Sequence, residues 1–261
     1  MPEFRVKFLY QHADADGGLL HLYDAAKSLE GIARALTITT HALLNGEVRT
    51  RADSAHGAEL YVKAPQRGSF IYEAVIYVGG VVTSGVFYDF LKYTFKEAIG
   101  IIEDEPQNRA LQRRIEPTMG ELPAVLENAL IDVHRPLVRS PQMTLKVTKP
   151  RGEVLVAFDE NTAKALQPQH INLSDPIIGH VTRYNTISRW GRIFDYSEHR
   201  VISFFLAPNL TERERSLVTW SLHQANTNAN GRLYMKGTAV VSPMQHKTKR
   251  YQITQVSDQP F

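Results

Sequence analysis

The stretch "GHVTRYNTISRWGRIF", residues 179–194, contains two short apolar–polar alternations separated by a polar turn. An alternation with a period of two is typical of a β-strand with one buried face. Three further strand-like runs follow, "RVISFFLA", "RLYMKGTAVV" and "RYQITQV", and one helical pattern, "TERERSLVTWSLHQAN", lies among them. Five strands and one helix in under 90 residues predict a small, mostly antiparallel, barrel-like β domain over residues 175–261.

The pattern of apolar and polar residues differs in the preceding part of the chain, and it predicts an α+β domain of helices and hairpins over residues 1–170. Apolar residues at every second position of 4–10 predict a half-buried strand. Apolar residues at steps of three, four and seven over 25–43 predict a long helix. Hairpins are expected at 58–78, with a loop at 64–69, and at 142–158. Helices are expected at 84–101 and 109–134, and a linker at 166–176.

The ends of two helices can be predicted from capping residues. Asp24 stands before the long N-terminal helical pattern and is the expected N-cap, and Asn45-Gly46 is the expected C-cap pair. Thr211 precedes the helical pattern of the second domain, and Glu214 follows three residues later, which is the spacing of a capping box.

Composition excludes several classes of protein. The chain has no cysteine, which rules out disulfides and thiolate chemistry and fits a reducing, cytoplasmic setting. The N-terminus lacks the basic and apolar regions of a signal peptide. The most apolar run, residues 70–91, is interrupted by Glu73 and Asp89, so no membrane span is expected.

The segment "QHADADGGLLHLYD", residues 11–24, is a candidate metal site, because two histidines and three aspartates lie close together in it. Asp14 and Asp16, with His12 or His21, could coordinate a divalent cation that activates water, which would make the protein a metal-dependent hydrolase. A calcium loop would need a ligand at its fifth position and a glutamate at its twelfth, and both are missing. Because Asp and Gly are also ordinary turn residues, we favour a local turn and predict no metal and no other cofactor.

No familiar catalytic motif is present, since the sequence lacks G-x-S-x-G, G-K-S/T, G-x-G-x-x-G and H-E-x-x-H patterns. His41 and His134 fall inside helical patterns and are expected to be packing or surface residues. These observations favour a non-catalytic protein without excluding an enzyme.

Positive charge is concentrated in the second domain. Residues 175–261 contain eleven Lys and Arg against six Asp and Glu, a net charge of +5, whereas the first 174 residues carry −2. Such an asymmetry is a hint of a polyanionic partner. "GHVTRYNTISRWGRIF" also resembles, in rhythm, the first hairpin of cold-shock and other OB-like barrels, although the Lys-Gly-Phe-Gly-Phe core of cold-shock proteins is missing.

The resemblance to OB-like barrels implies nucleic-acid binding, in which aromatic side chains stack on bases while Arg and Lys contact phosphates. The candidate binding residues are Arg183, Tyr184, Arg189, Trp190, Arg192, Phe204, Lys236, Lys247, Lys249 and Arg250.

Residues 8–75 resemble a family of uncharacterised bacterial proteins. The resemblance rests on "ADADGGLLHLYDAAKSLEGIARALTITTHALLNGE" and "GAELYVKAPQRGSF", and it implies a bacterial or phage-related setting but no activity. The expected function is therefore a non-catalytic recognition component that binds nucleic acid, within a multi-protein assembly such as an antiviral system. The alternatives are a homo-oligomeric structural or interaction protein and the metal-dependent hydrolase. Protein partners or self-association are expected, and a membrane is not.

Overall fold

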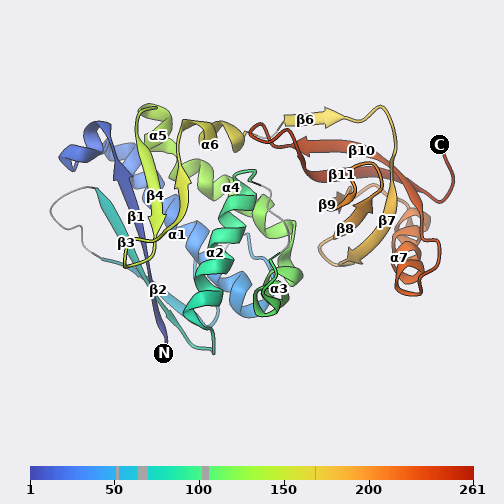
Figure 1. The fold of residues 1–261 in the computed structure, drawn as a ribbon, viewed down its shortest axis with the longest axis horizontal. Helices are drawn as coiled ribbons and strands as arrows, with labels where there is room; N and C mark the ends of the chain where they lie inside the picture. The colour runs from blue at the N-terminus through green and yellow to red at the C-terminus, as the bar shows by residue number, and fades with distance from the viewer. Residues whose placement is uncertain (51–52, 64–69, 102–105, 168) are drawn as a thin grey trace. The chain divides into compact units, whose positions relative to one another are not determined.

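The computed structural model describes residues 1–50, 53–63, 70–101, 106–167 and 169–261. Contacts within the chain divide it into two compact units, Met1–Gln167 and Pro168–Phe261. Each unit has its own hydrophobic core. The first unit combines helices with an open sheet and the second contains a closed barrel, so the predicted α+β class is confirmed (Figure 1).

The N-terminal unit is built on an antiparallel sheet with the strand order β2-β3-β1-β4-β5. The predicted hairpins are confirmed as the pairs β2–β3 and β4–β5. The predicted loop at 64–69 lies outside the described residues. Every second side chain of β1 is buried, as the alternation indicated. The strands are β1 (Glu3–Gln11), β2 (Ala58–Val62), β3 (Ile71–Val78), β4 (Thr144–Thr148) and β5 (Val154–Phe158).

Helices pack against one face of this sheet and form a single core with it. The helix α1 approaches α4 closely at Gly31, where a Cβ atom would lie 2.6 Å from the carbonyl oxygen of Ala129. Only glycine therefore permits this approach of the two backbones. The helices are α1 (Leu22–Asn45), α2 (Ser84–Ala98), α3 (Arg109–Ile115), α4 (Glu121–Val133), α5 (Arg135–Arg139) and α6 (Glu160–Ala165), with 3-10 turns η1 (Ala13–Gly17) and η2 (Glu116–Thr118).

The two ends of α1 give opposite outcomes for the predicted caps. Gly46 ends the helix in the left-handed conformation, with φ of 68°, and its N–H donates to the carbonyl of Ala42, so the C-cap prediction is confirmed. The prediction of Asp24 as N-cap is wrong. The helix begins at Leu22, with His21 in the cap position, and this earlier start places Asp24 inside the first turn.

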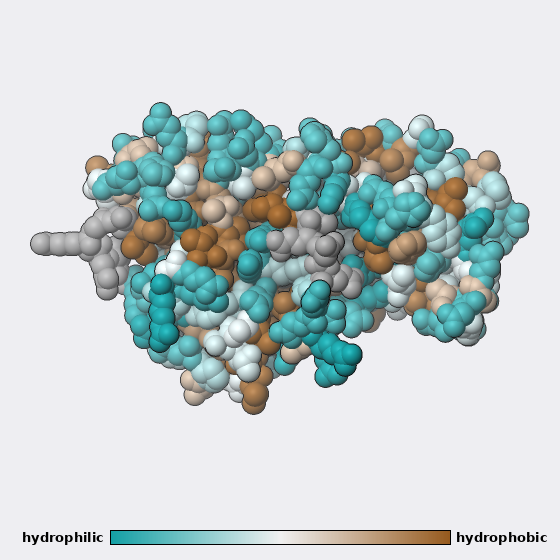
Figure 2. Space-filling model, viewed as in Figure 1, coloured by the Kyte–Doolittle hydropathy of each residue, from teal (hydrophilic) through white to brown (hydrophobic). Residues whose placement is uncertain are grey.

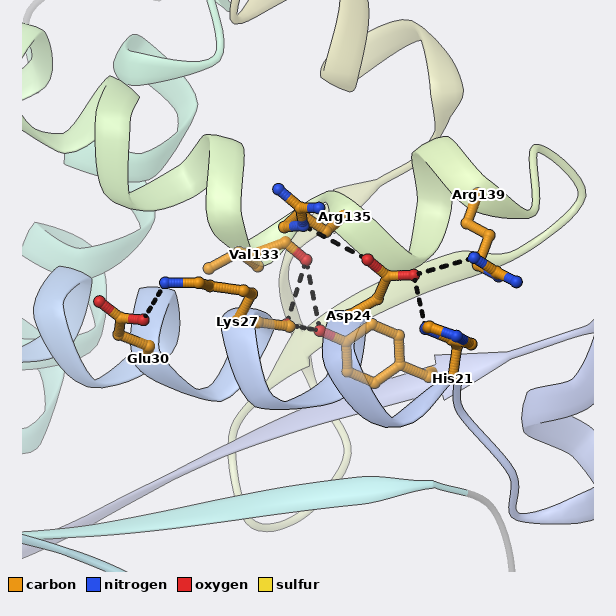
Figure 3. Close-up of polar contacts among 9 residues, drawn as sticks. His21, Asp24, Lys27, Glu30, Val133, Arg135 and Arg139 are labelled. Carbon is orange, nitrogen blue, oxygen red and sulfur yellow. Dashed lines mark hydrogen bonds and ion pairs between the residues drawn. The ribbon is translucent and has the colours of Figure 1, made fainter.

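Asp24 instead joins α1 to α5 through its carboxylate, which is almost completely buried (Figure 3). Its Oδ1 lies 3.3 Å from Nε of Arg135, and its Oδ2 lies 3.7 Å from Arg139 and 3.2 Å from Nδ1 of His21. Both arginines come from α5, so the side chain that could have capped one helix holds two helices together.

The two helical histidines are packing residues, one of the two options expected for them. His134 hydrogen-bonds a backbone carbonyl through Nδ1 and the hydroxyl of Thr162 through Nε2, at 2.9 Å. Burial lowers the pKa of His134 to about 4, so the ring is neutral at pH 7. His41 is fully buried and contacts the carboxylate of Glu47 at 3.1 Å.

The C-terminal unit is a barrel that closes in the order β7-β8-β9-β11-β10 and back to β7. β9 and β11 run parallel, and the other neighbouring strands are antiparallel. A further strand, β6, also pairs with β10 and forms within the stretch expected to be a linker. The elements are β6 (Gln169–Asn172), β7 (Ile177–Tyr184), β8 (Trp190–Asp195), β9 (Arg200–Leu206), α7 (Glu212–Asn226), β10 (Leu233–Val241) and β11 (Thr248–Ser257).

A buried polar contact ties two strands of the barrel together. The hydroxyl of Tyr251 on β11 donates to the carboxylate of Asp195 on β8 at 2.7 Å. Burial alone would raise the pKa of Asp195, but hydrogen bonds from Ser197, Tyr251 and the N–H of Glu198 outweigh it, so that the pKa lies below its ordinary value. The carboxylate is therefore charged and fully partnered at neutral pH.

The helix α7 begins as predicted. Thr211 accepts a hydrogen bond from the N–H of Glu214, whose side chain accepts one from the N–H of Thr211, so the capping box is confirmed. Glu214 also accepts a hydrogen bond from the N–H of Val256 at 3.1 Å, which fixes the helix to β11. On the face drawn in Figure 2, hydrophilic residues predominate and apolar ones form small groups between them.

Candidate nucleic-acid interface

The outer face of β8 and β9 brings together the central residues of the predicted binding surface. Trp190, Arg192 and Phe194 are half-buried and alternate with buried residues, so they share the outer face of β8. In the antiparallel register, Trp190 lies opposite Phe205 and Arg192 lies opposite Ser203 of β9. Directly opposite residues point to the same side of a sheet, so these five side chains lie on one face, on which Ser203 is buried and the other four are half-buried.

Two groups of aromatic side chains lie on this surface. The aromatic pair consists of Trp190 and Phe205, whose ring centroids are 5.6 Å apart. The aromatic cluster consists of Phe194 with His180 and Tyr196, at centroid distances of 5.5 and 6.0 Å. Nδ1 of His180 lies 3.1 Å from the hydroxyl of Tyr196, and partial burial lowers the pKa of His180, which favours its neutral form. Trp190 and Phe194 are about 13 Å apart along β8, because four residues of an extended strand rise by that much.

Three arginines lie in register between the two aromatic groups. Arg183 on β7 lies opposite Arg192, Arg192 lies opposite Ser203, and Ser203 lies beside Arg250 of β11. We call Arg183, Arg192 and Arg250 the arginine row. Arginine side chains can donate paired hydrogen bonds to phosphate oxygens.

Two of the predicted aromatic binding residues, Phe204 and Tyr184, pack in or against the barrel core instead of lying on the outer face. Phe204 is completely buried in the barrel core, so its prediction as a stacking residue is wrong. It points inward because Gly191 opposite it leaves the space: a Cβ atom at Gly191 would lie 2.3 Å from the Phe204 ring. Tyr184 stacks on Phe204 at 6.3 Å, and its half-buried ring packs against the core.

The other predicted basic residues lie around the barrel rather than on the face of β8 and β9. Arg189 is in the turn between β7 and β8, with φ of 61°. Lys247 is exposed in the connection from β10 to β11, and Lys249 is half-buried at the start of β11. Lys236 is exposed on β10, where its Nζ lies 4.2 Å from the centroid of the Phe261 ring.

Sequence reasoning missed several members of this surface, in particular Phe205, Phe194, His180 and Tyr196. The missing signal for Phe205 was parity. In β9 the core residues Ile202, Phe204 and Leu206 occupy alternate positions, so Ser203 and Phe205 point to the other side. The same rule, applied to β8 from Trp190, places Phe194 on the outer face.

The segment with Asp14 and Asp16 forms the 3-10 turn η1, as the turn interpretation predicted. The backbone N–H of His12 donates to Oδ1 of Asp16 at 2.7 Å, and Gly18 closes the turn in the left-handed conformation. Within the described ranges, which omit 51–52, 64–69, 102–105 and 168, no three His, Cys, Asp or Glu side chains are grouped as metal ligands.

Comparison with known proteins gives a family match in the N-terminal unit. A family model described as "Domain of unknown function (DUF7946)" matches residues 6–104. The match agrees with the predicted resemblance of residues 8–75 to an uncharacterised family and adds no activity. No curated protein and no solved structure matches the chain. None of the helices in the described part of the chain has the length and apolarity that crossing a bilayer requires.

Proposed function

We propose that the C-terminal unit binds single-stranded nucleic acid on the outer face of β8 and β9, and that the protein is a non-catalytic recognition component. The observation that carries the proposal is the arginine row, which lies in register between the aromatic pair and the aromatic cluster. Arginines supply phosphate contacts and aromatic rings supply stacking surfaces, and a polynucleotide offers both at regular intervals.

The strand order of the barrel supports an OB-like interpretation. β7, β8 and β9 follow one another as neighbours, α7 comes next, and the last strand β11 lies between β9 and β10. In OB-like barrels, the second and third strands and the loops after the first and fourth strands bind oligonucleotides or oligosaccharides. These strands correspond here to β8 and β9, and the loops to residues 185–189 and 242–247, which contain Arg189 and Lys247.

The geometry favours a single strand over a duplex. In a duplex, base faces are covered by neighbouring bases, so protein aromatic rings reach them only where bases are unstacked. Two stacking groups about 13 Å apart, with cations between them, suit a strand whose bases are splayed and whose phosphates lie over the arginine row. The net charge of +5 over residues 175–261 adds a longer-range attraction that salt will weaken.

The proposal can be tested on the full-length chain with labelled oligodeoxythymidine, oligouridine and a duplex of equal length. We expect fluorescence anisotropy to show tighter binding of the single strands at low salt. Trp190→Ala should weaken binding about tenfold, because stacking on one base is worth about 1–3 kcal/mol. Trp220→Ala is the matched control, since Trp220 is exposed on α7.

A second pair of variants examines the charge. Arg192→Ala in the arginine row should weaken binding, and Arg213→Ala on the exposed side of α7 should leave it unchanged. Thermal melts identify variants that fail to fold, in which case Trp190→Leu replaces Trp190→Ala. If the folded protein binds no single strand at low salt, or if both tryptophan variants behave alike, the proposal is wrong.

The remaining expectations about function gain no support from the described residues. The antiviral-type assembly and the hydrolase at Asp14 and Asp16 stay predictions.

A further inference from the structure

β2 forms one edge of the N-terminal sheet, and no described strand pairs with its outer side. The side chains of Tyr61 and Val62 are 56% and 54% exposed. The strand contains no proline and one charged residue, Glu59, whereas natural edge strands often use proline and charges to prevent pairing with another chain. Glu59 lies within β2 and Lys63 directly follows it, so the two residues stand on either side of Tyr61. Within one copy, the carboxylate of Glu59 accepts a hydrogen bond from the hydroxyl of Tyr61 at 2.8 Å, and Nζ of Lys63 lies 3.0 Å from the carboxylate of Glu73 on β3.

The backbone of β2 presents hydrogen-bonding groups to the open side at two residues. Successive residues in an antiparallel ladder direct their N–H and C=O groups alternately to the two sides. The N–H of Lys63 donates to the carbonyl of Glu73 on β3 at 2.9 Å. Residues 59, 61 and 63 therefore bond to β3, and the N–H and C=O groups of Leu60 and Val62 point to the open edge.

The side chains of β2 are complementary to those of a second, reversed copy. If two β2 strands run antiparallel about a two-fold axis at Tyr61, Leu60 lies opposite Val62 of the other copy and Glu59 lies opposite Lys63. The open N–H and C=O groups of Leu60 and Val62 then form four hydrogen bonds across the axis. Glu59, Tyr61 and Lys63 fall on non-hydrogen-bonded positions, where opposing side chains approach most closely.

We propose that the protein forms a symmetric dimer in which β2 of one copy pairs with β2 of the other, antiparallel and centred on Tyr61. The two five-stranded sheets then continue into one another. One self-complementary patch serves both copies, as a closed two-fold interface requires. A pair of short strands buries less surface than a standard interface, so we expect a dissociation constant in the micromolar range or weaker.

Charge reversal tests the register. Glu59→Lys replaces two attractive cross-strand pairs by two repulsive ones and should raise the dissociation constant about tenfold, as should Lys63→Glu. The double variant Glu59→Lys/Lys63→Glu restores both cross-strand pairs and should recover part of the affinity. Recovery is incomplete because Lys63→Glu also removes the ion pair of Lys63 with Glu73 on β3. Glu3→Lys lies on β1, two strands away from β2, and should have no effect.

A single introduced cysteine tests the axis. The chain has no cysteine of its own, and the two Tyr61 Cα atoms would lie about 4.5 Å apart, within the range that a disulfide spans. Tyr61→Cys should therefore form a covalent dimer under mild oxidation. Tyr77→Cys on β3 is the matched control, because two such residues would be separated by three strand spacings across the sheet and by four residues along it, about 20 Å in all.

Sedimentation of the full chain over a concentration series that reaches about 1 mM reports the association itself. A concentration-dependent dimer, loss and rescue by the charge variants, and cross-linking through Tyr61→Cys alone would support the proposal. A protein that stays monomeric throughout the series overturns it. A dimer that ignores the charge variants, or that cross-links equally through Tyr77→Cys, shows that the interface lies elsewhere.

Discussion

The two sheets of this chain differ in their edges, because one ends in an edge strand and the other closes into a barrel. The N-terminal sheet is open, and its edge strand β2 keeps backbone groups and exposed side chains available for a partner strand. The C-terminal sheet closes on itself through the pair β10–β11, so its principal strands have neighbours on both sides. An open sheet recognises partners through its edge, whereas a barrel recognises them through the side chains on its outer face.

The largest effect is expected from two adjacent residues of β9, one buried in the barrel core and one on its outer face. Phe204→Ala should lower the free energy of unfolding of the barrel by about 3–5 kcal/mol, because it removes a fully buried ring. Phe205→Ala removes a half-buried ring from the outer face and should cost much less, while weakening binding of a single strand. Denaturant unfolding and anisotropy, measured on both variants, check this pair. Equal destabilisation by both would show that the outer face is part of the core.

The contact between Tyr251 and Asp195 gives the next largest effect. Tyr251→Phe should cost about 1.5–3 kcal/mol at pH 7, because it removes a hydrogen bond to a buried charged group. The folded state depresses the pKa of Asp195, so the carboxylate stabilises the barrel above its unfolded pKa, and this contribution is lost as the pH falls through the folded value. The cost of Tyr251→Phe should therefore shrink in unfolding experiments at acidic pH. A cost that is independent of pH would contradict this assignment.

Asp24 provides a smaller effect in the open-sheet unit, where two roles can be separated. If Asp24 acts as the ion-pair partner of Arg135 and Arg139, both Asp24→Ala and Asp24→Asn remove the pair. Each variant should then lower the free energy of unfolding by about 1 kcal/mol. As an N-cap, Asp24 could be replaced by Asn at almost no cost, because the two cap equally well. Thermal unfolding at low and high salt distinguishes the roles, and the ion-pair role predicts that salt reduces the difference from wild type.

The smallest effect on stability is expected from basic residues at the start of β11 and in the loop before it, of which Lys247 is exposed and Lys249 and Arg250 are half-buried. Replacing Lys247, Lys249 and Arg250 together with alanine should change unfolding little and flatten the salt dependence of binding. Each lost phosphate contact on a single strand should reduce the slope of log affinity against log salt by about 0.7. Trp190→Ala should lower affinity with an almost unchanged slope. Titrations at several salt concentrations check both, and a slope that the triple variant leaves intact would exclude these residues from the interface.

Periodicity predicted most of the individual elements but not how they meet. The alternation over residues 4–10, the helix ending at Gly46 and the capping box at Thr211 are local features, and each is confirmed. The roles of Asp24 and Phe204 depend on residues far away in the sequence. Asp24 forms ion pairs with Arg135 and Arg139 instead of capping the helix. Phe204 can point inward because Gly191 opposite it has no side chain.

For the same reason, the sequence predicted several residues of the candidate surface but not their arrangement. Trp190, Arg192, Arg183 and Arg250 were recognised from residue type, because arginines beside aromatic residues indicate nucleic-acid contact. Their common row became visible only with the register of four strands, which no local pattern reveals. The self-complementarity of β2 likewise depends on which of its backbone groups face β3, so it too required the ladder.

The position of β11 has a consequence for biosynthesis. Residues 248–257 pair with β9 on one side and β10 on the other, so a ribosome must deliver nearly the whole second unit before the ring of strands can close. β1, by contrast, is synthesised first but lies in the middle of its sheet. It can pair only after β3 and then β4, at residues 144–148, have been synthesised. Both units thus depend on contacts between segments that are synthesised far apart in time, which predicts slow folding and a long interval during which nascent strands need protection.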